Sequence, residues 1–308
     1  MFIVFAAVVP ITVVLVLGAV LRRTALRSPD VWRGIEWLSY FVFTPTLFIS
    51  SIGSTDLASL NAVPLLASLV VPLSAATALV LALRRPLRVS GPAVTSIVQG
   101  SVRINTYVGL AFAAALHGTE GVASFAIASA VVVPLVNVLC VSTLARFGDV
   151  PDSQPRPRLL RELATNPLIL ACAVGVALSL TGVGVPAAVA PSLDLLSAPA
   201  LVAGTLAAGA AIRFDARWRD LLDISLASVL KLVAVPWAAA SIAIALGVSG
   251  VPLVAIVLIT AVPTAPSATV LAARMGGDTR LMASITAVQT ILSTVTLPAA
   301  VALLAGAP

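Results

Sequence analysis

The stretch PTAPS at residues 263–267 interrupts a long apolar segment and decides how we expect this chain to fold. Two prolines within four residues remove backbone donors and strain the turns before them, so a helix through this segment has to break. A second interruption, RINTYVG at residues 103–109, lies at a matching place in another apolar segment. Broken helices inside a bilayer are tolerated only where protein or a water-filled cavity surrounds them.

Apolar segments of membrane-spanning length make up most of the chain. It has 308 residues, of which 60% are hydrophobic and 10% charged, and its mean hydropathy is +1.12. A soluble domain carries about 25% charged residues, and a helix needs roughly 20 residues to cross a bilayer. The expected spans are residues 2–22, 36–53, 62–83, 92–116, 121–145, 166–182, 193–212, 224–246, 251–273 and 281–305. We therefore predict an all-α integral membrane protein of ten transmembrane helices, with breaks in helices 4 and 9.

The basic residues alternate between the gaps that separate these spans. All except Arg103 and Lys231 fall in the gaps after spans 1, 3, 5, 7 and 9. The other gaps hold no Lys or Arg, and two of them hold the acids Asp56 and Glu120. Basic loops are retained in the cytoplasm during insertion, so we predict a protein of the cell (inner) membrane with both termini outside. The net charge of +6 then reflects topology and contact with membrane lipids, and no nucleic-acid partner is expected.

The two halves of the chain resemble each other. Pro10 to Gly18 in span 1 has the spacing of Pro167 to Gly175 in span 6, and Pro45 in span 2 corresponds to Pro199 in span 7. Five spans per half is an odd number, so the halves must have opposite orientations, which is the signature of secondary transporters. The predicted parts are a first repeat at residues 1–145, a short cytoplasmic linker at 146–165 and a second, inverted repeat at 166–308.

The binding site of inverted-repeat transporters lies where the broken helices meet near the bilayer midplane. Hydroxyl and amide groups at the two breaks can partner freed backbone groups or face a substrate, and Asn105 is the leading candidate because it lies at a break itself. The candidates for substrate binding are Arg103, Asn105, Thr106, Tyr107, Pro263, Thr264, Pro266, Ser267 and Gln289. No catalytic residue, metal ligand or cofactor is predicted.

Arg103 has two interpretations, which both remain open at this point. It is the only charge that we place near the bilayer midplane, where an unpaired charge costs about 2.5–3.5 kcal/mol on insertion scales. In the first interpretation its guanidinium, with nearby helix N-termini, attracts a carboxylate. In the second it caps the carbonyl groups freed by the break. Lys231, in contrast, is expected near the cytoplasmic end of span 8, where its side chain can reach the interface.

The residues around the second break resemble the auxin efflux carrier family, including its bacterial malonate-carrier-like members. The match is strongest in Val262–Asp278 and its continuation to Pro298, and the pattern from Arg103 to Gly109 resembles the family's fourth helix. The resemblance implies a scaffold of spans 1, 2, 6 and 7 and a mobile unit of the remaining spans, which moves as an elevator. It also implies that the substrates are organic anions, such as dicarboxylates or indole acids, and we predict a carrier of a small organic anion such as malonate or another carboxylate. A coupling proton or sodium ion is a partner that the sequence leaves open.

Two other functions stay open from the sequence. One is a sodium-coupled carrier of the bile-acid-symporter type, although the middle of spans 4 and 9 offers no acidic sodium ligand. The other is a membrane sensor with a transporter-like core. An enzyme is not expected, because the protease-like string GVSG at 247–250 falls in an outer turn, and one His with two separated Cys makes a poor metal site. A homodimer is a further possibility that the sequence leaves open.

Overall fold

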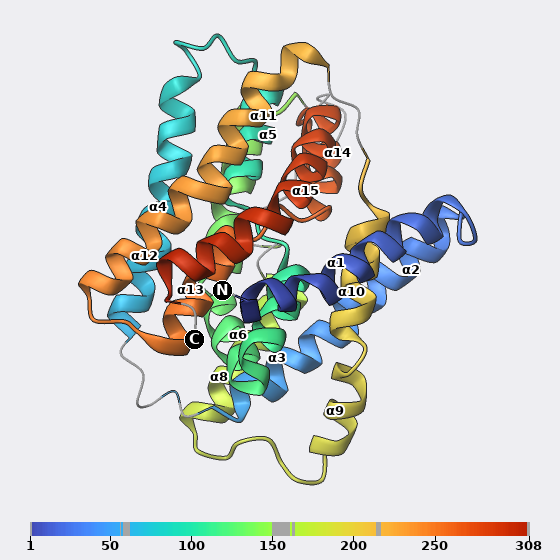
Figure 1. The fold of residues 1–308 in the computed structure, drawn as a ribbon, viewed down its shortest axis with the longest axis vertical. Coiled ribbons are helices and arrows are strands. Elements are labelled where there is room, and N and C mark those ends of the chain that lie inside the picture. Colours follow the sequence, from blue (N-terminus) through green and yellow to red (C-terminus); the bar gives the residue numbers. More distant parts are fainter. Residues whose placement is uncertain are drawn as a thin grey trace.

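The computed structural model describes residues 2–55, 57, 62–149, 161, 164–213 and 217–306, and every regular element in them is a helix. Asp56, Arg156, Arg158 and most of the predicted linker lie outside the described residues. The elements (Figure 1) are α1 (Phe2–Arg23), α2 (Pro29–Leu38), the π turn η1 (Ser39–Phe43), α3 (Thr44–Gly53), α4 (Ala62–Leu83), α5 (Gly91–Val102), α6 (Thr106–Phe147), α8 (Pro167–Leu180), α9 (Ala190–Ser197), α10 (Ala200–Ala210), the 3-10 turn η2 (Trp218–Asp220), α11 (Leu221–Val229), the π turn η3 (Leu230–Ala234), α12 (Val235–Ala245), α13 (Gly250–Ala261), α14 (Ser267–Met275) and α15 (Thr279–Leu304).

The predicted all-α membrane architecture is confirmed. In the described part of the chain, six helical stretches are long and apolar enough to cross a membrane by length and composition. They are Pro29–Gly53, Ala62–Leu83, Gly91–Phe147, Ala190–Ala210, Trp218–Ala245 and Thr279–Leu304. Two shorter apolar helices are α8 and α13. With α1, these helices cover each of the ten expected spans, because the longest stretch contains both span 4 and span 5.

Spans 2 and 8 begin earlier than the sequence suggested, at Pro29 and Trp218 instead of residues 36 and 224. Charged residues in their first turns hid the helices from a hydropathy argument. In span 2, Ser28 caps the helix by accepting a hydrogen bond from the Asp30 N–H, as an N-cap serine does. Because span 8 begins earlier, each of its residues lies farther from the start of the span than the sequence suggested. Lys231 is one of these residues.

Two π turns lie within these spans, and each ends just before a proline at the second position of the next helix. The prolines are Pro45 in α3 and Pro236 in α12. A proline cannot donate to the preceding turn and its ring crowds the carbonyl four residues back. A π turn widens the helix at that point, and such turns recur at functional sites. The wide turn η3 carries Lys231.

The glycines of α1 and α10 allow these two helices to approach closely. A Cβ atom added at Gly18 would lie 2.1 Å from the carbonyl oxygen of Leu206, and one added at Gly209 would lie 2.0 Å from that of Leu15. No hydrophobic driving force brings helices together in lipid, so the close packing that small residues allow drives their association instead. Helices α3 and α8 pack in the same manner around Gly175. Spans 1 and 7 therefore form one tight pair, and spans 2 and 6 form another.

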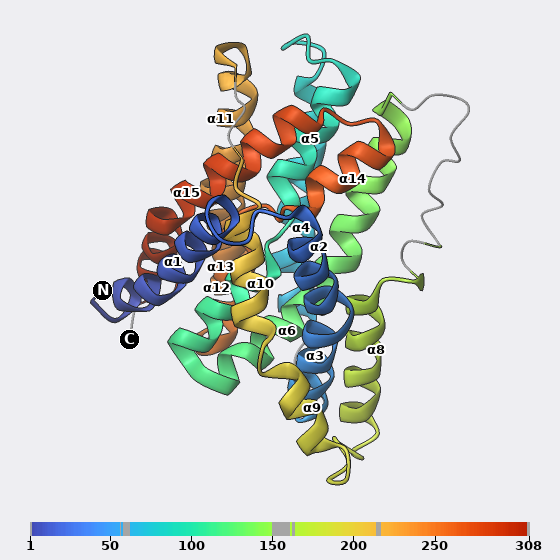
Figure 2. The same ribbon diagram turned by 90° about the vertical axis from the view of Figure 1, so that its right-hand side faces the viewer.

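The remaining helices pack mainly with one another. Helix α4 lies against α12, α5 against α11 and α15, and α13 against α6 (Figures 1 and 2). The turn between α14 and α15 is bonded to the start of α5, since the Ser96 hydroxyl donates to the Asp278 carbonyl at 2.8 Å and the Asp278 N–H to the Pro92 carbonyl at 3.2 Å. Helix α6 also contacts α1, α3, α8 and α10, so it lies between this group and the two tight pairs.

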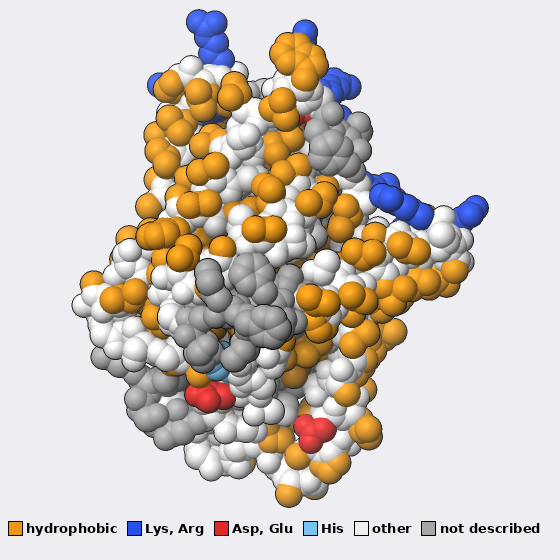
Figure 3. Space-filling view, viewed as in Figure 1, with side chains coloured by type: hydrophobic (Ala, Val, Ile, Leu, Met, Phe, Trp, Pro, Cys, Tyr) orange, Lys and Arg blue, Asp and Glu red, His pale blue; other side chains and the backbone are white. Residues whose placement is uncertain are grey.

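Basic side chains gather at one end of the molecule. In Figure 3, Lys and Arg lie at the upper end and at the right-hand corner, two groups of acidic atoms are visible at the lower end, and hydrophobic side chains dominate the surface between them. Other acids lie with the basic residues, since Asp30 pairs with Arg33 and Asp220 with Arg280. The start of α1 and the end of α15 lie close together in Figures 1 and 2, as an even number of spans requires. Which end faces the cytoplasm, and the inverted repeat itself, stay predictions.

The contact between α1 and α10 generates a prediction. Gly209→Ala is expected to lower the free energy of unfolding by about 1–3 kcal/mol, because the new methyl group meets backbone that has to move. The matched control is Gly34→Ala in α2, since a Cβ added at Gly34 meets no atom within 4 Å. Thermal unfolding in detergent would measure both variants. Equal unfolding temperatures of the two variants would contradict the close packing of α1 on α10.

Candidate functional site

The two predicted helix breaks are present, and they lie next to each other in space. Helix α5 ends at Val102 and is followed by Arg103 in an extended conformation, and Asn105 precedes the first turn of α6. Helix α13 ends at Ala261 and is followed by the extended Val262, and α14 begins after Pro266. In Figures 1 and 2, α5 and α14 lie above the level of the breaks, with α13 and the first part of α6 below them. The breaks in helices 4 and 9 are therefore confirmed.

Hydrogen bonds join the two breaks directly. The Asn105 N–H donates to the Pro263 carbonyl at 2.8 Å. The Gly100 carbonyl, freed at the end of α5, accepts from the Thr264 hydroxyl at 3.0 Å and from Nε2 of Gln289 at 2.9 Å. Oε1 of Gln289 accepts from the Thr264 N–H at 3.0 Å. Four of the predicted site residues thus come together, and all four are buried.

One polar atom of the Asn105 side chain has a hydrogen-bond partner, and the other has none among the described residues. Its side chain is 1% exposed, and Oδ1 accepts from the Val108 N–H at 3.3 Å, which caps α6. Nδ2 is buried and has no hydrogen-bond partner among the described residues. Buried donors almost always have a partner in folded proteins. The Asn105 amide is therefore a donor that a bound molecule can satisfy.

Arg103 bridges the breaks through its side chain. Nη2 donates to the Ser267 hydroxyl at 3.3 Å, whereas Nη1 is buried and has no hydrogen-bond partner in the described part of the chain. The Gly100 carbonyl at the end of α5 is already occupied, because it accepts hydrogen bonds from Thr264 and Gln289. The binding of an anion by the guanidinium stays a prediction.

The remaining candidates lie at the edges of this arrangement. Thr106 is the first residue of α6, and Pro266 directly precedes α14. Tyr107 packs against α10, because a Cβ atom added at Gly204 would lie 2.2 Å from its ring. The structure thus places Tyr107 at the contact between α6 and the α1–α10 pair.

The prediction that Lys231 reaches the cytoplasmic interface is wrong. Its side chain is 0% exposed, and Nζ has no hydrogen-bond partner among the described residues. The helical stretch runs from Trp218 to Ala245, so Lys231 lies at its middle and not near its end. The chain's only lysine is therefore a second basic residue inside a membrane-spanning stretch, in addition to Arg103.

Three further buried polar residues escaped the sequence argument. The Cys140 thiol of α6 interacts electrostatically with both Arg103 and Lys231. Gln99 of α5 is fully buried, and neither amide atom has a hydrogen-bond partner in the described residues. The Ser228 hydroxyl, one turn before Lys231, has none either. Of these three, only Gln99 could have been predicted from the sequence, because it is an amide one turn before the break in a span that contains no acidic residue.

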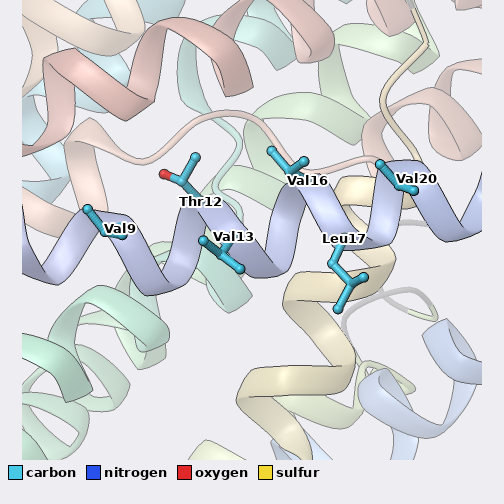
Figure 4. Close-up of a pocket in the computed structure, with 6 residues that line it drawn as sticks. All are labelled: Val9, Thr12, Val13, Val16, Leu17 and Val20. Carbon is cyan, nitrogen blue, oxygen red and sulfur yellow. The ribbon is translucent and has the colours of Figure 1, made fainter.

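A groove on the outside of α1 is unrelated to the breaks (Figure 4). It follows one face of this single helix, and its lining is apolar apart from one threonine. The lining residues are Val9, Thr12, Val13, Val16, Leu17 and Val20. None of the predicted site residues takes part in it. An exposed apolar helix face of this kind is the surface that a membrane-spanning helix presents to lipid.

Comparison with known families supports a transport role for this arrangement. A family model described as "membrane transport protein" matches residues 154–301. The matched part contains the whole second break and Gln289. No curated protein matches the chain.

The bonds of Gln289 generate a second prediction. Gln289→Leu removes one acceptor and one donor that hold the two breaks together, so it is expected to lower the free energy of unfolding by about 1–3 kcal/mol. Thr290→Val on the same helix is the control, because that hydroxyl only bonds the Thr286 carbonyl in the preceding turn. Thermal unfolding of both variants measures the difference. A Gln289→Leu protein as stable as Thr290→Val would show that these bonds do not stabilise the crossing.

Proposed function

We propose that this chain is a member of the auxin efflux carrier family and a secondary active transporter of a small organic anion, since a family model described as "membrane transport protein" matches its residues 154–301. Malonate or another short carboxylate is the proposed substrate. The observation that supports this proposal most strongly is the crossing of the two breaks, where buried donors of Asn105 and Arg103 have no hydrogen-bond partner among the described residues. The family is one of transporters, which supports a function without catalysis.

The charges around the crossing suit an anion. Helices α6 and α14 both begin there, and helix N-termini carry partial positive charge. The N-terminus of α14 has no side-chain cap among the described residues. Arg103 adds a full positive charge, and spans 4, 9 and 10 contain no Asp or Glu. A carboxylate at this place would satisfy Nδ2 of Asn105 and Nη1 of Arg103 together.

The packing also supports an elevator movement as the proposed mechanism. The α1–α10 and α3–α8 pairs would form the scaffold, and the group that carries both breaks would move against it. Helix α6 and Tyr107 would then lie on the sliding surface. We place the protein in the cell (inner) membrane with both termini outside, and its transport would be coupled to protons or sodium.

A sodium-coupled carrier of the bile-acid-symporter type is less well supported. Sodium requires oxygen ligands, and two carbonyl oxygens at the crossing, those of Gly100 and Pro263, already accept hydrogen bonds. Nδ2 of Asn105 and Nη1 of Arg103, which have no hydrogen-bond partner among the described residues, are donors and repel a cation. A sensor with a transporter-like core is distinguished from a carrier by the absence of transport.

The proposal is tested by uptake of labelled malonate and other mono- and dicarboxylates into proteoliposomes, with and without imposed pH and sodium gradients. The wild type is expected to show saturable uptake. Asn105→Ser keeps a side-chain oxygen that caps α6 but loses Nδ2. Loss of a hydrogen bond to a charged group costs about 1.5–3 kcal/mol, so uptake is expected to fall about tenfold or more. The stricter Asn105→Ala is expected to abolish uptake in a protein that still inserts.

The matched control for this experiment is Asn166→Ser. Asn166 also caps a helix, with its side chain accepting from the N–H groups of Leu168 and Ile169, but it lies at the start of α8. Its variant is expected to transport like the wild type. Equal transport by Asn105→Ser and Asn166→Ser would remove Asn105 from the site. No uptake of any carboxylate by correctly inserted wild type would overturn the carrier proposal and favour the sensor.

A further inference from the structure

A half-buried arginine and a fully buried lysine lie near one thiol beside the crossing of the breaks. Arg103, at the end of α5, and Lys231, in η3, both interact electrostatically with Cys140 of α6. With Gln99 and Ser228 these residues form what we call the buried polar cluster. The cluster has four side chains with polar atoms that lack a hydrogen-bond partner in the described residues: Gln99, Arg103, Ser228 and Lys231. Arg103 belongs both to this cluster and to the crossing.

No carboxylate in the described structure neutralises Lys231. The elements packed against η3 are α5, α11, α12, α13 and α15. Helices α5, α12 and α13 contain no charged residue. The one charged residue of α15, Arg280, pairs with Asp220 at the far end of the helix. Asp223 of α11 lies eight residues before Lys231, or about 12 Å along a helix.

A buried ammonium group without an anionic partner is costly, and such groups persist in proteins where function requires them. Within a membrane-spanning segment, an ionisable residue of this kind marks a substrate or ion pathway. The π turn that holds Lys231 is itself a feature that often accompanies a functional site. We therefore expect the partner of Lys231 to be an anion that passes through the protein.

We infer that Lys231 and Arg103 together select dianions, with Arg103 binding one carboxylate of the substrate at the crossing and Lys231 attracting the other. This inference rests on the proposed function and names its preferred substrate class, a short dicarboxylate over a monocarboxylate. Gln99 and Ser228 would hydrogen-bond the carboxylate oxygens on the Lys231 side. A monocarboxylate leaves one of the two cations without a partner, and that cost is the source of the selectivity.

Competition for labelled malonate uptake tests the inference. Unlabelled malonate and acetate are compared as competitors in the wild type, Lys231→Met and Lys231→Arg. The wild type and Lys231→Arg are expected to prefer malonate. Lys231→Met, which keeps the length of the side chain without its charge, is expected to lose about tenfold or more of its affinity for malonate while its affinity for acetate changes less than twofold.

The chain's single lysine permits a second measurement that needs no variant. Protein labelled with ¹³C at the lysine side chain gives one lysine signal in detergent micelles, and saturating malonate is expected to shift it more than acetate does. Unchanged selectivity in Lys231→Met, or a lysine signal that malonate leaves in place, would overturn this inference while the carrier proposal stands. A wild type that carries no anion would overturn both.

Discussion

The constraint on which this structure depends is that backbone groups inside a bilayer must find partners within the protein. The prolines of residues 263–267 break one helix and release such groups, and the second break at residues 103–105 provides their partners. The N–H of Asn105 bonds the carbonyl of Pro263, and the side chains of Thr264 and Gln289 bond the carbonyl of Gly100. The breaks stabilise each other, and each would be costly alone.

The same pairing explains why the site is rich in donors. The carbonyl oxygens of Gly100 and Pro263 accept bonds between the two breaks, whereas Nδ2 of Asn105 and Nη1 of Arg103 have no hydrogen-bond partner among the described residues. Two helices begin at this place, which adds partial positive charge. In the carrier that we propose, these donors would attract a carboxylate to the crossing, and Lys231 would extend the positive charge away from it.

Much of this arrangement could be predicted from the sequence, because prolines and charges are strong local signals. The breaks, the ten apolar segments and the meeting of Asn105, Pro263, Thr264 and Gln289 agree with the prediction. Lys231 was missed for a physical reason: the charged first turns of span 8 hide its start, so the lysine seemed to lie near an end. The direction in which Tyr107 points depends on how α6 packs against α10, which no local pattern reveals.

The most direct test of the central claim is ligand-induced stabilisation of the purified protein. A ligand that binds the folded state alone raises its stability by RT ln(1 + [L]/Kd). The account predicts that malonate or a related carboxylate raises the unfolding temperature of the wild type in a saturable way and leaves that of Asn105→Ser unchanged. An equal rise in both proteins would place the anion elsewhere and contradict the assignment of the crossed breaks as the binding site.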